Sequence, residues 1–190
     1  MRDLSLHVLD LAQNSVVAGA KRIEISLCVD RAADKLTFVI ADDGCGMSEE
    51  LLSRVRSPFA TTRTTRKVGL GIPMMEERAR MTGGGLSIES KPGEGTKLTA
   101  WMTISHIDRP PLGDLAGTLL SLILMAPDTL DYALRLEGIG EPFALDTRDV
   151  REALGGVPLS EPDAVMWMRE SLEEAIAPYR ALDNEFNRHG

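Results

Sequence analysis

Residues 36–47 read LTFVIADDGCGM, and they place a carboxylate where the core of the protein should continue. Leu36, Phe38 and Ile40 alternate with the residues between them, a period of two that predicts a half-buried β-strand. In the same phase, Asp42 falls on the buried face. Because an unpaired carboxylate is costly to bury, we expect Asp42 to accept hydrogen bonds, either from backbone amides of a turn or from a ligand.

The composition is typical of a globular chain. The 190 residues are 43% hydrophobic and 26% charged, which suits one mid-sized domain, or one domain with a small appendage. Cys28 and Cys45 do not suggest a disulfide framework. No signal-peptide core is apparent, and the longest apolar run, residues 119–126, is far shorter than the roughly 20 residues that span a bilayer. We therefore expect a soluble, cytoplasmic protein without a membrane partner.

The net charge of −8 is unevenly distributed along the chain. Residues 1–104 contain 14 Lys and Arg against 13 Asp and Glu, whereas residues 105–190 contain 7 against 16. Nucleic-acid phosphates are bound by clustered Lys and Arg, so the acidic second part argues against a nucleic-acid partner. It fits a basic protein partner, and it also fits a well-solvated surface.

Hydrophobic periodicity predicts an alternation of helices and strands. We expect helices at residues 4–18, 72–82, 113–125, 148–154 and 162–177, and a short helix capped by Ser48. We expect three hairpins, with strands at residues 22–29 and 35–42, 86–90 and 97–104, and 130–136 and 142–146. The composition changes at residues 105–112, which we interpret as a linker. It would separate an amino-terminal domain, residues 1–104, from a small acidic α+β domain of unknown role, residues 113–190.

The first predicted helix carries polar side chains on one face. His7, Asp10 and Asn14 are spaced i, i+3 and i+7, so they lie about one turn apart. The Asn14 amide oxygen and the Asp10 carboxylate are hard ligands of the kind that Mg²⁺ prefers. Asp10 could instead act as a base toward water or a hydroxyl. A solvated helix face explains the same pattern, and we expect His7 to be structural.

A polar, basic stretch, TTRTTRKVGLG, precedes the predicted helix at residues 72–82. Its hydroxyl and cationic side chains could bind an anion, together with backbone amides at the positive end of the helix. A surface loop is the alternative interpretation. The candidate anion-binding residues are Thr61, Thr62, Arg63, Lys67, Val68, Gly69, Leu70 and Gly71.

Two glycine motifs complete the candidate set. Gly44 and Gly46 would let the backbone lie close to a flat base such as adenine, whose exocyclic amine could donate to Asp42. Met47 ends the same motif. The stretch GEGT, which ends at Thr96, is a common hairpin turn when taken alone.

Together, these motifs resemble the GHKL ATP-binding superfamily, which includes DNA gyrase, MutL mismatch-repair proteins, a heat-shock chaperone and the histidine kinases. LDLAQNSVVAGAKRIEI is similar to its N-box, DDGCGM to its first glycine box, SPFATT to its F-box, and GLGI and GEGT to its later glycine boxes. The stretch from PFATT to GTKLT is most similar to the histidine-kinase catalytic domain. The resemblance implies a Bergerat-type α/β (α+β) two-layer sandwich, with a mixed, mainly antiparallel sheet under helices.

The resemblance also implies ATP and Mg²⁺ as cofactors. Asn14 would hold Mg²⁺, Asp42 would bind the adenine amine, and Gly69 and Gly71 would contact the triphosphate beneath a mobile lid. Asp10 stands where the ATPase members of the superfamily have a Glu that activates water. Lys67 replaces the first glycine of the usual Gly-x-Gly-Leu-Gly.

Histidine kinases carry a phosphoacceptor helix before this domain, whereas this chain begins at the N-box. His106 lies in HIDRPPL, which shares four residue types with the phosphoacceptor pattern, but Pro110 and Pro111 are incompatible with a long helix there. A linker that docks the second domain is the plainer interpretation.

These features leave more than one function open. One is a stand-alone, ATP-dependent protein kinase of signal transduction, histidine- or serine-kinase-like, that acts on a separate partner. Another is an anti-sigma-like protein that binds its partner according to bound ATP or ADP, without catalysis, and a third is a slow ATPase. We expect residues 113–190 to recognise the protein partner. The sequence does not decide the oligomeric state.

Overall fold

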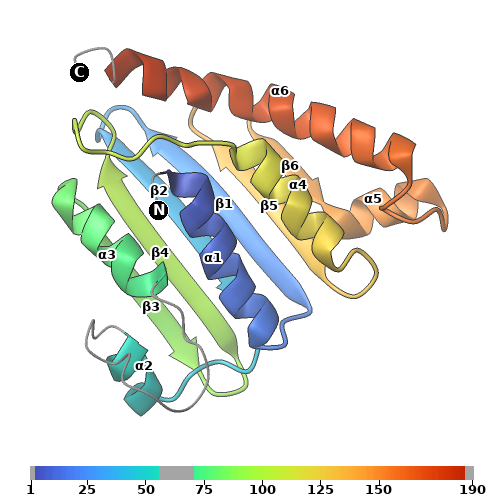
Figure 1. Ribbon diagram of the computed structural model, residues 1–190, viewed down its shortest axis with the longest axis horizontal. Coiled ribbons are helices and arrows are strands. Elements are labelled where there is room, and N and C mark those ends of the chain that lie inside the picture. Colours follow the sequence, from blue (N-terminus) through green and yellow to red (C-terminus); the bar gives the residue numbers. More distant parts are fainter. Residues whose placement is uncertain (1–2, 56–70, 187–190) are drawn as a thin grey trace.

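The computed structural model describes residues 3–55 and 71–186 as helices, strands and connecting loops (Figure 1). Most of the predicted elements are present with ends that shift by a few residues. In chain order the elements are α1 (Leu4–Val17), β1 (Arg22–Asp30), β2 (Lys35–Asp42), α2 (Glu49–Val55), α3 (Gly71–Met81), β3 (Gly85–Lys91), β4 (Gly95–Thr103), α4 (Leu115–Met125), β5 (Asp131–Glu137), β6 (Phe143–Asp146), α5 (Thr147–Leu154) and α6 (Pro162–Phe186).

The six strands form one mixed sheet in the order β3-β4-β2-β1-β5-β6. Neighbouring strands are antiparallel, except that β1 and β5 run parallel. Helices α1, α3 and α4 lie over one face of the sheet, and α6 packs beside α4 (Figure 1). The predicted fold class, a two-layer α+β arrangement with a mixed, mainly antiparallel sheet, is therefore confirmed.

One face of the sheet is buried beneath the helices. Along β1 and most of β2, every second residue is buried, which matches the period of two in the sequence. Helix α1 contributes Leu4, Val8 and Leu11, and these side chains join those of the strands in one apolar cluster. Packing of α1 on this face brings its carboxyl-terminal half close to the end of β2.

The chain after residue 104 differs from the expected separate domain, because its strands continue the same sheet. β5 pairs with β1 over seven residues, from Arg22 opposite Asp131 to Cys28 opposite Glu137. Without β5, β1 would be an edge strand with unpaired backbone groups, which proteins avoid exposing. Tyr132, Leu134 and Leu136 of β5 belong to the same apolar cluster as α1. The residue limits of the proposed division stay a prediction.

A buried arginine ties the predicted linker to the end of α6. Arg109 is 3% exposed, and its guanidinium donates to the carbonyl oxygens of Ile104, at 2.8 Å, and Pro110, at 3.1 Å. Arg109 Nη1 also lies 3.0 Å from Asp183 Oδ1 on α6, while Asp183 Oδ2 accepts a hydrogen bond from the backbone N of Leu112. Residues 105–112 are therefore held firmly between the two parts of the chain.

Helix α6 is longer than predicted. The sequence predicted an end at Ala177, and the next residue, Pro178, lacks the backbone N–H that continues a helix. The structure continues through Pro178 to Phe186. The reason is tertiary: Tyr179 and Leu182 extend the buried stripe of the helix, so packing outweighs the hydrogen bond that Pro178 removes. Among residues 3–55 and 71–186, no helix combines the length and the apolar content needed to cross a membrane.

We predict that Arg109→Met lowers the free energy of unfolding by about 3–5 kcal/mol, because it leaves Asp183 without its buried cation. Urea unfolding followed by circular dichroism measures the change. The control is Lys91→Met, which removes an exposed pair with Glu94 and should cost less than about 1 kcal/mol. Equal effects of the two substitutions would contradict a structural role for Arg109.

Candidate functional site

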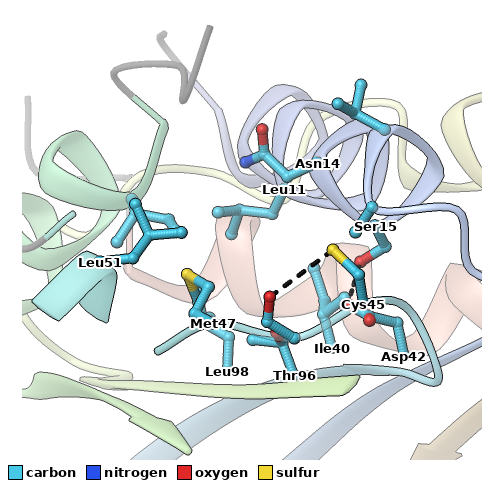
Figure 2. Close-up of a pocket in the computed structure, with 14 residues that line it drawn as sticks. Leu11, Asn14, Ser15, Ile40, Asp42, Cys45, Met47, Leu51, Thr96 and Leu98 are labelled. Carbon is cyan, nitrogen blue, oxygen red and sulfur yellow. Dashed lines mark hydrogen bonds between the residues drawn. The ribbon is translucent and has the colours of Figure 1, made fainter. Parts of the chain in front are cut away.

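A pocket opens at the end of β2, between α1, the loop after β2, α2, the start of α3 and β4 (Figure 2). Most of its lining side chains are apolar, and a few polar groups lie among them, as in small-molecule sites generally. The residues that line it are Leu11, Asn14, Ser15, Val17, Ala18, Ile40, Asp42, Cys45, Gly46, Met47, Leu51, Ile72, Thr96 and Leu98.

The carboxylate of Asp42 is held by two donors of the protein. Ser15 Oγ, on α1, donates to Asp42 Oδ2 at 2.6 Å, and the backbone N of Gly44 donates to Oδ1 at 2.9 Å. Figure 2 shows Ser15 and Asp42 close together at one end of the pocket. Each carboxylate oxygen can accept more than one hydrogen bond, so Asp42 keeps acceptor capacity for a ligand in the pocket.

The loop after β2 is anchored at both of its sides. Asp43 Oδ1 accepts hydrogen bonds from the backbone N of Lys21, at 2.7 Å, and of Arg22, at 2.9 Å. The backbone N of Cys45 donates to the carbonyl oxygen of Ala18, just past α1, at 2.9 Å. These bonds fix the loop against the end of α1 and the start of β1, so the pocket wall that it forms is defined by backbone contacts.

The same loop packs on the turn between β3 and β4, where the motif GEGT begins. The backbone N of Gly93 donates to the carbonyl oxygen of Cys45 at 2.8 Å. Gly46 has a φ of +64°, and a Cβ there would lie 1.9 Å from the carbonyl oxygen of Lys91. Only glycine fits this conformation and this close approach. Two of the glycine motifs of the sequence are thus in direct contact.

A row of polar side chains on α1 lies beside and within the pocket. Asp10 Oδ2 and Asn14 Nδ2 are buried and have no hydrogen-bond partner among the described residues. A Cβ on Gly71, the first residue of α3, would lie 1.7 Å from Asp10 Oδ2. The backbone at the start of α3 therefore approaches Asp10 so closely that a side chain at position 71 would displace the carboxylate.

These orphaned polar atoms suit a hard cation. Rotation of the Asn14 amide would present its oxygen in place of Nδ2, next to a second oxygen donor on Asp10 one turn away. Within the described part of the chain, no group of three or more His, Cys, Asp and Glu side chains is arranged to hold a metal ion. Mg²⁺ does not need such a group, because it is commonly held by one or two side chains together with water and substrate phosphates.

The sequence profile of the "Histidine kinase-, DNA gyrase B-, and HSP90-like ATPase" family matches residues 2–106, more than half of the chain. The protein belongs to this family. The match contains the pocket and strands β1 to β4, while β5 and β6 lie beyond it. Residues 2–106 are thus a GHKL ATPase domain, as the sequence motifs indicated.

Curated relatives are sensor kinases and similar proteins of bacteria. The chain is 36% identical over 92 residues to the sensor protein kinase FleS of Pseudomonas aeruginosa, covering 48% of this chain and 23% of that one. It is 26% identical over 98 residues to sporulation kinase D of Bacillus subtilis, covering 52% and 19%. It is 28% identical over 111 residues to the non-motile and phage-resistance protein of Caulobacter vibrioides, covering 54% and 13%. The chain spans less than a quarter of the length of each.

A solved structure supports the fold alone. The crystal structure of the N-terminal domain of a DNA repair protein matches 77% of this chain and 53% of that one, with a TM-score of 0.52 and 13% identity. Because this coverage exceeds the length of the family match, the similarity of fold extends past residue 106.

The structure brings together only part of the predicted site. Asn14, Asp42, Gly46, Met47 and Thr96 line the pocket. Three other predicted residues, Asp10, Gly44 and Gly71, are close to the pocket without lining it. The backbone N of Gly44 donates to Asp42, and Gly71 lies against Asp10. The remaining predicted site residues lie outside the described part of the chain; they are Thr61, Thr62, Arg63, Lys67, Val68, Gly69 and Leu70.

Ser15 lines the pocket and was not predicted as a site residue from the sequence. It lies on the stripe of α1 that contains Leu4, Val8 and Leu11, where a hydroxyl needs a partner. A hydroxyl on an otherwise apolar helix stripe is a signal that the sequence contains. Its partner is the carboxylate of Asp42, which likewise lies on the apolar face of its strand. The apolar wall formed by Leu11, Ile40 and Leu98 gave no signal of its own, because these residues match an ordinary core.

His7, the first residue of the polar row, is fully buried, and neither ring nitrogen has a hydrogen-bond partner among the described residues. Burial, with a contribution from the positive charge of Arg78, lowers the pKa of His7 to about 4. A neutral, enclosed imidazole agrees with the structural role expected for this residue.

We predict that His7 makes the fold acid-sensitive. Its pKa is lower in the folded chain than in the unfolded chain, so the unfolded chain binds more protons between pH 6.5 and 4. Stability should therefore fall as the pH is lowered, by about 2 kcal/mol between pH 7 and pH 5. Urea unfolding at both values measures it. His7→Leu should remove this component, whereas His106→Gln should keep it; an unchanged pH dependence in His7→Leu would contradict the assignment.

Proposed function

We propose that this protein binds ATP and Mg²⁺ and acts as a stand-alone, kinase-like module of bacterial signal transduction on a separate partner protein. The observation that carries the proposal is the Asp42 carboxylate, fixed by Ser15 and Gly44 in the wall of a mostly apolar pocket. The family of ATPases to which the chain belongs supports ATP as the ligand.

The pocket suits an adenine base. Apolar side chains on opposite walls, such as Leu11 and Leu98, would cover the faces of the ring. Asp42 would accept a hydrogen bond from the exocyclic amine, while Ser15 holds the carboxylate in place. A purine with a carbonyl at the same position would place that acceptor against the Asp42 carboxylate, which is also an acceptor. This arrangement therefore selects adenine.

The other end of the site would hold the phosphates. Asn14, with Asp10 one turn away, would bind Mg²⁺, which when present neutralises phosphate charge and orients the triphosphate. Gly71 would contact the triphosphate through backbone at the start of α3. We assign the same role to Gly69 and the other candidate anion-binding residues before Gly71, which lie outside the described part of the chain.

Asp10 is the proposed catalytic residue. Its Oδ2 atom is buried beside Gly71 and has no partner among the described residues, so it could accept a proton from an attacking hydroxyl or water. Asp is one methylene shorter than the Glu that the resemblance places here in ATP-hydrolysing members. This difference favours transfer to a partner over rapid hydrolysis.

The alternative is an anti-sigma-like, nucleotide-gated binding protein without catalysis, or a slow ATPase. The acidic carboxy-terminal part supports a role in partner binding: residues 105–190 contain 7 Lys and Arg against 16 Asp and Glu. In this alternative, bound ATP or ADP alters the surface that the partner meets, and Asp10 serves only to position the metal.

Two substitutions separate these functions. Asp42→Asn should weaken ATP binding by at least about tenfold in isothermal titration with Mg²⁺, because a carboxylate hydrogen bond contributes roughly 1.5–3 kcal/mol. Asp10→Asn should keep the affinity within about threefold. It should lower phosphate release or transfer from labelled ATP by about 100-fold or more, as expected for loss of a general base.

The outcomes are distinct. Binding by the wild type without any phosphate release or transfer, unchanged in Asp10→Asn, would support the nucleotide-gated alternative. Absence of ATP binding by the wild type would overturn the proposed function altogether.

A further inference from the structure

The outward face of α6 exposes two large apolar side chains. Met166 is 54% exposed and Trp167 is 53% exposed, whereas Ala164 and Met168, on the opposite side of the helix, are buried. In Figure 1, α6 runs along the edge of the molecule, and no other helix or strand of residues 3–55 and 71–186 covers its outer side. Tryptophan and methionine are enriched at the centres of protein interfaces, where they contribute much of the binding energy.

Carboxylates flank this apolar pair on the same face. Asp163 lies one turn before Trp167, Glu170 one turn after it, and Glu174 one turn further. All three are exposed, and none forms an ion pair with another described residue. The neighbouring Glu173 differs, because its carboxylate accepts a hydrogen bond from Arg180 at 2.8 Å.

Beyond Glu174, the face continues with small residues. Ala177, Pro178 and Ala181 are exposed and uncharged. The face from residue 163 to residue 181 extends over about five helical turns, or roughly 27 Å at 1.5 Å per residue. This length suits an extended contact with one helix or strand of a partner.

The charge of the face restricts what can cover it. Anionic lipid and nucleic acid would be repelled by the carboxylates. A second copy of this chain would place the same carboxylates opposite one another, and the whole chain already has a net charge of −8. A positively charged protein segment is complementary, and its cations can also stack on the tryptophan ring.

We propose that the outward face of α6 docks a basic segment of a partner protein. Lys or Arg side chains of that segment pair with Asp163, Glu170 and Glu174, and an apolar side chain packs on Met166 and Trp167. The face shares no residue with the pocket at the end of β2. The proposal therefore does not depend on nucleotide binding, and ATP titration of the same variants shows independently whether the pocket is intact.

The chain offers its own reporter, because it contains two tryptophans, Trp101 and Trp167. In a Trp101→Phe background, the emission of Trp167 should shift to the blue on titration with a synthetic amphipathic helical peptide of Leu and Lys. Binding should weaken as salt is added, since exposed charges are screened. A peptide with Glu in place of Lys should cause no shift.

Charge reversal localises the contact. Glu170→Lys with Glu174→Lys should weaken binding of the Leu/Lys peptide by at least tenfold. The matched control is Glu49→Lys with Glu50→Lys on α2, which changes the net charge equally and should keep the affinity within about threefold. Both positions of the control are exposed.

Three results would overturn the proposal. One is an equal loss of affinity in the two double variants, which would indicate attraction by net charge alone. Another is no peptide binding at all. The third is an emission shift of Trp167 that depends on protein concentration without peptide, with dimers in sedimentation, which would assign the face to a second copy of this chain.

Discussion

The hydrogen bond from Ser15 to Asp42 connects the two layers of the protein at the point where the pocket opens. Ser15 belongs to the buried stripe of α1, and Asp42 is the last residue of β2. A hydroxyl and a carboxylate in these positions would each be costly to bury alone. Together, and with the amide of Gly44, they satisfy one another and still leave the carboxylate able to accept from a ligand.

Backbone hydrogen bonds and close backbone approaches position the rest of the site around this contact. The loop after β2 is bonded to the end of α1, to the start of β1 and to the β3–β4 turn, and glycine at position 46 permits the last of these approaches. On the other side, Gly71 brings the start of α3 against Asp10. Rigid elements therefore position each polar side chain, which is what a preorganised binding site requires.

The carboxy-terminal part supports this site indirectly. β5 covers the edge of β1, and α4 packs against α1, the helix that carries Asp10, Asn14 and Ser15. Arg109 and Asp183 fasten the connecting segment to α6. The outward face of α6, with exposed Met166 and Trp167, points away from these contacts and shares no residue with the pocket.

Local patterns predicted much of the fold and some of the site. Alternation in β1 and β2 and the apolar stripe of α1 each depend on neighbours in sequence, and these predictions are confirmed. Pairing of β5 with β1 joins segments more than 100 residues apart, so no local pattern reveals it. The extension of α6 past Pro178 also depends on distant packing, as does the partnership of Ser15 with Asp42.

The most direct test of the account is to compare the affinity of the wild-type protein for ATP and for inosine triphosphate, with Mg²⁺, by isothermal titration. Inosine has a carbonyl where adenine has its amine, so Asp42 would meet an acceptor in place of a donor. We predict that inosine triphosphate binds at least about tenfold more weakly than ATP. Equal affinity for the two nucleotides would show that Asp42 does not accept a hydrogen bond from the adenine amine, and would contradict the proposed binding mode.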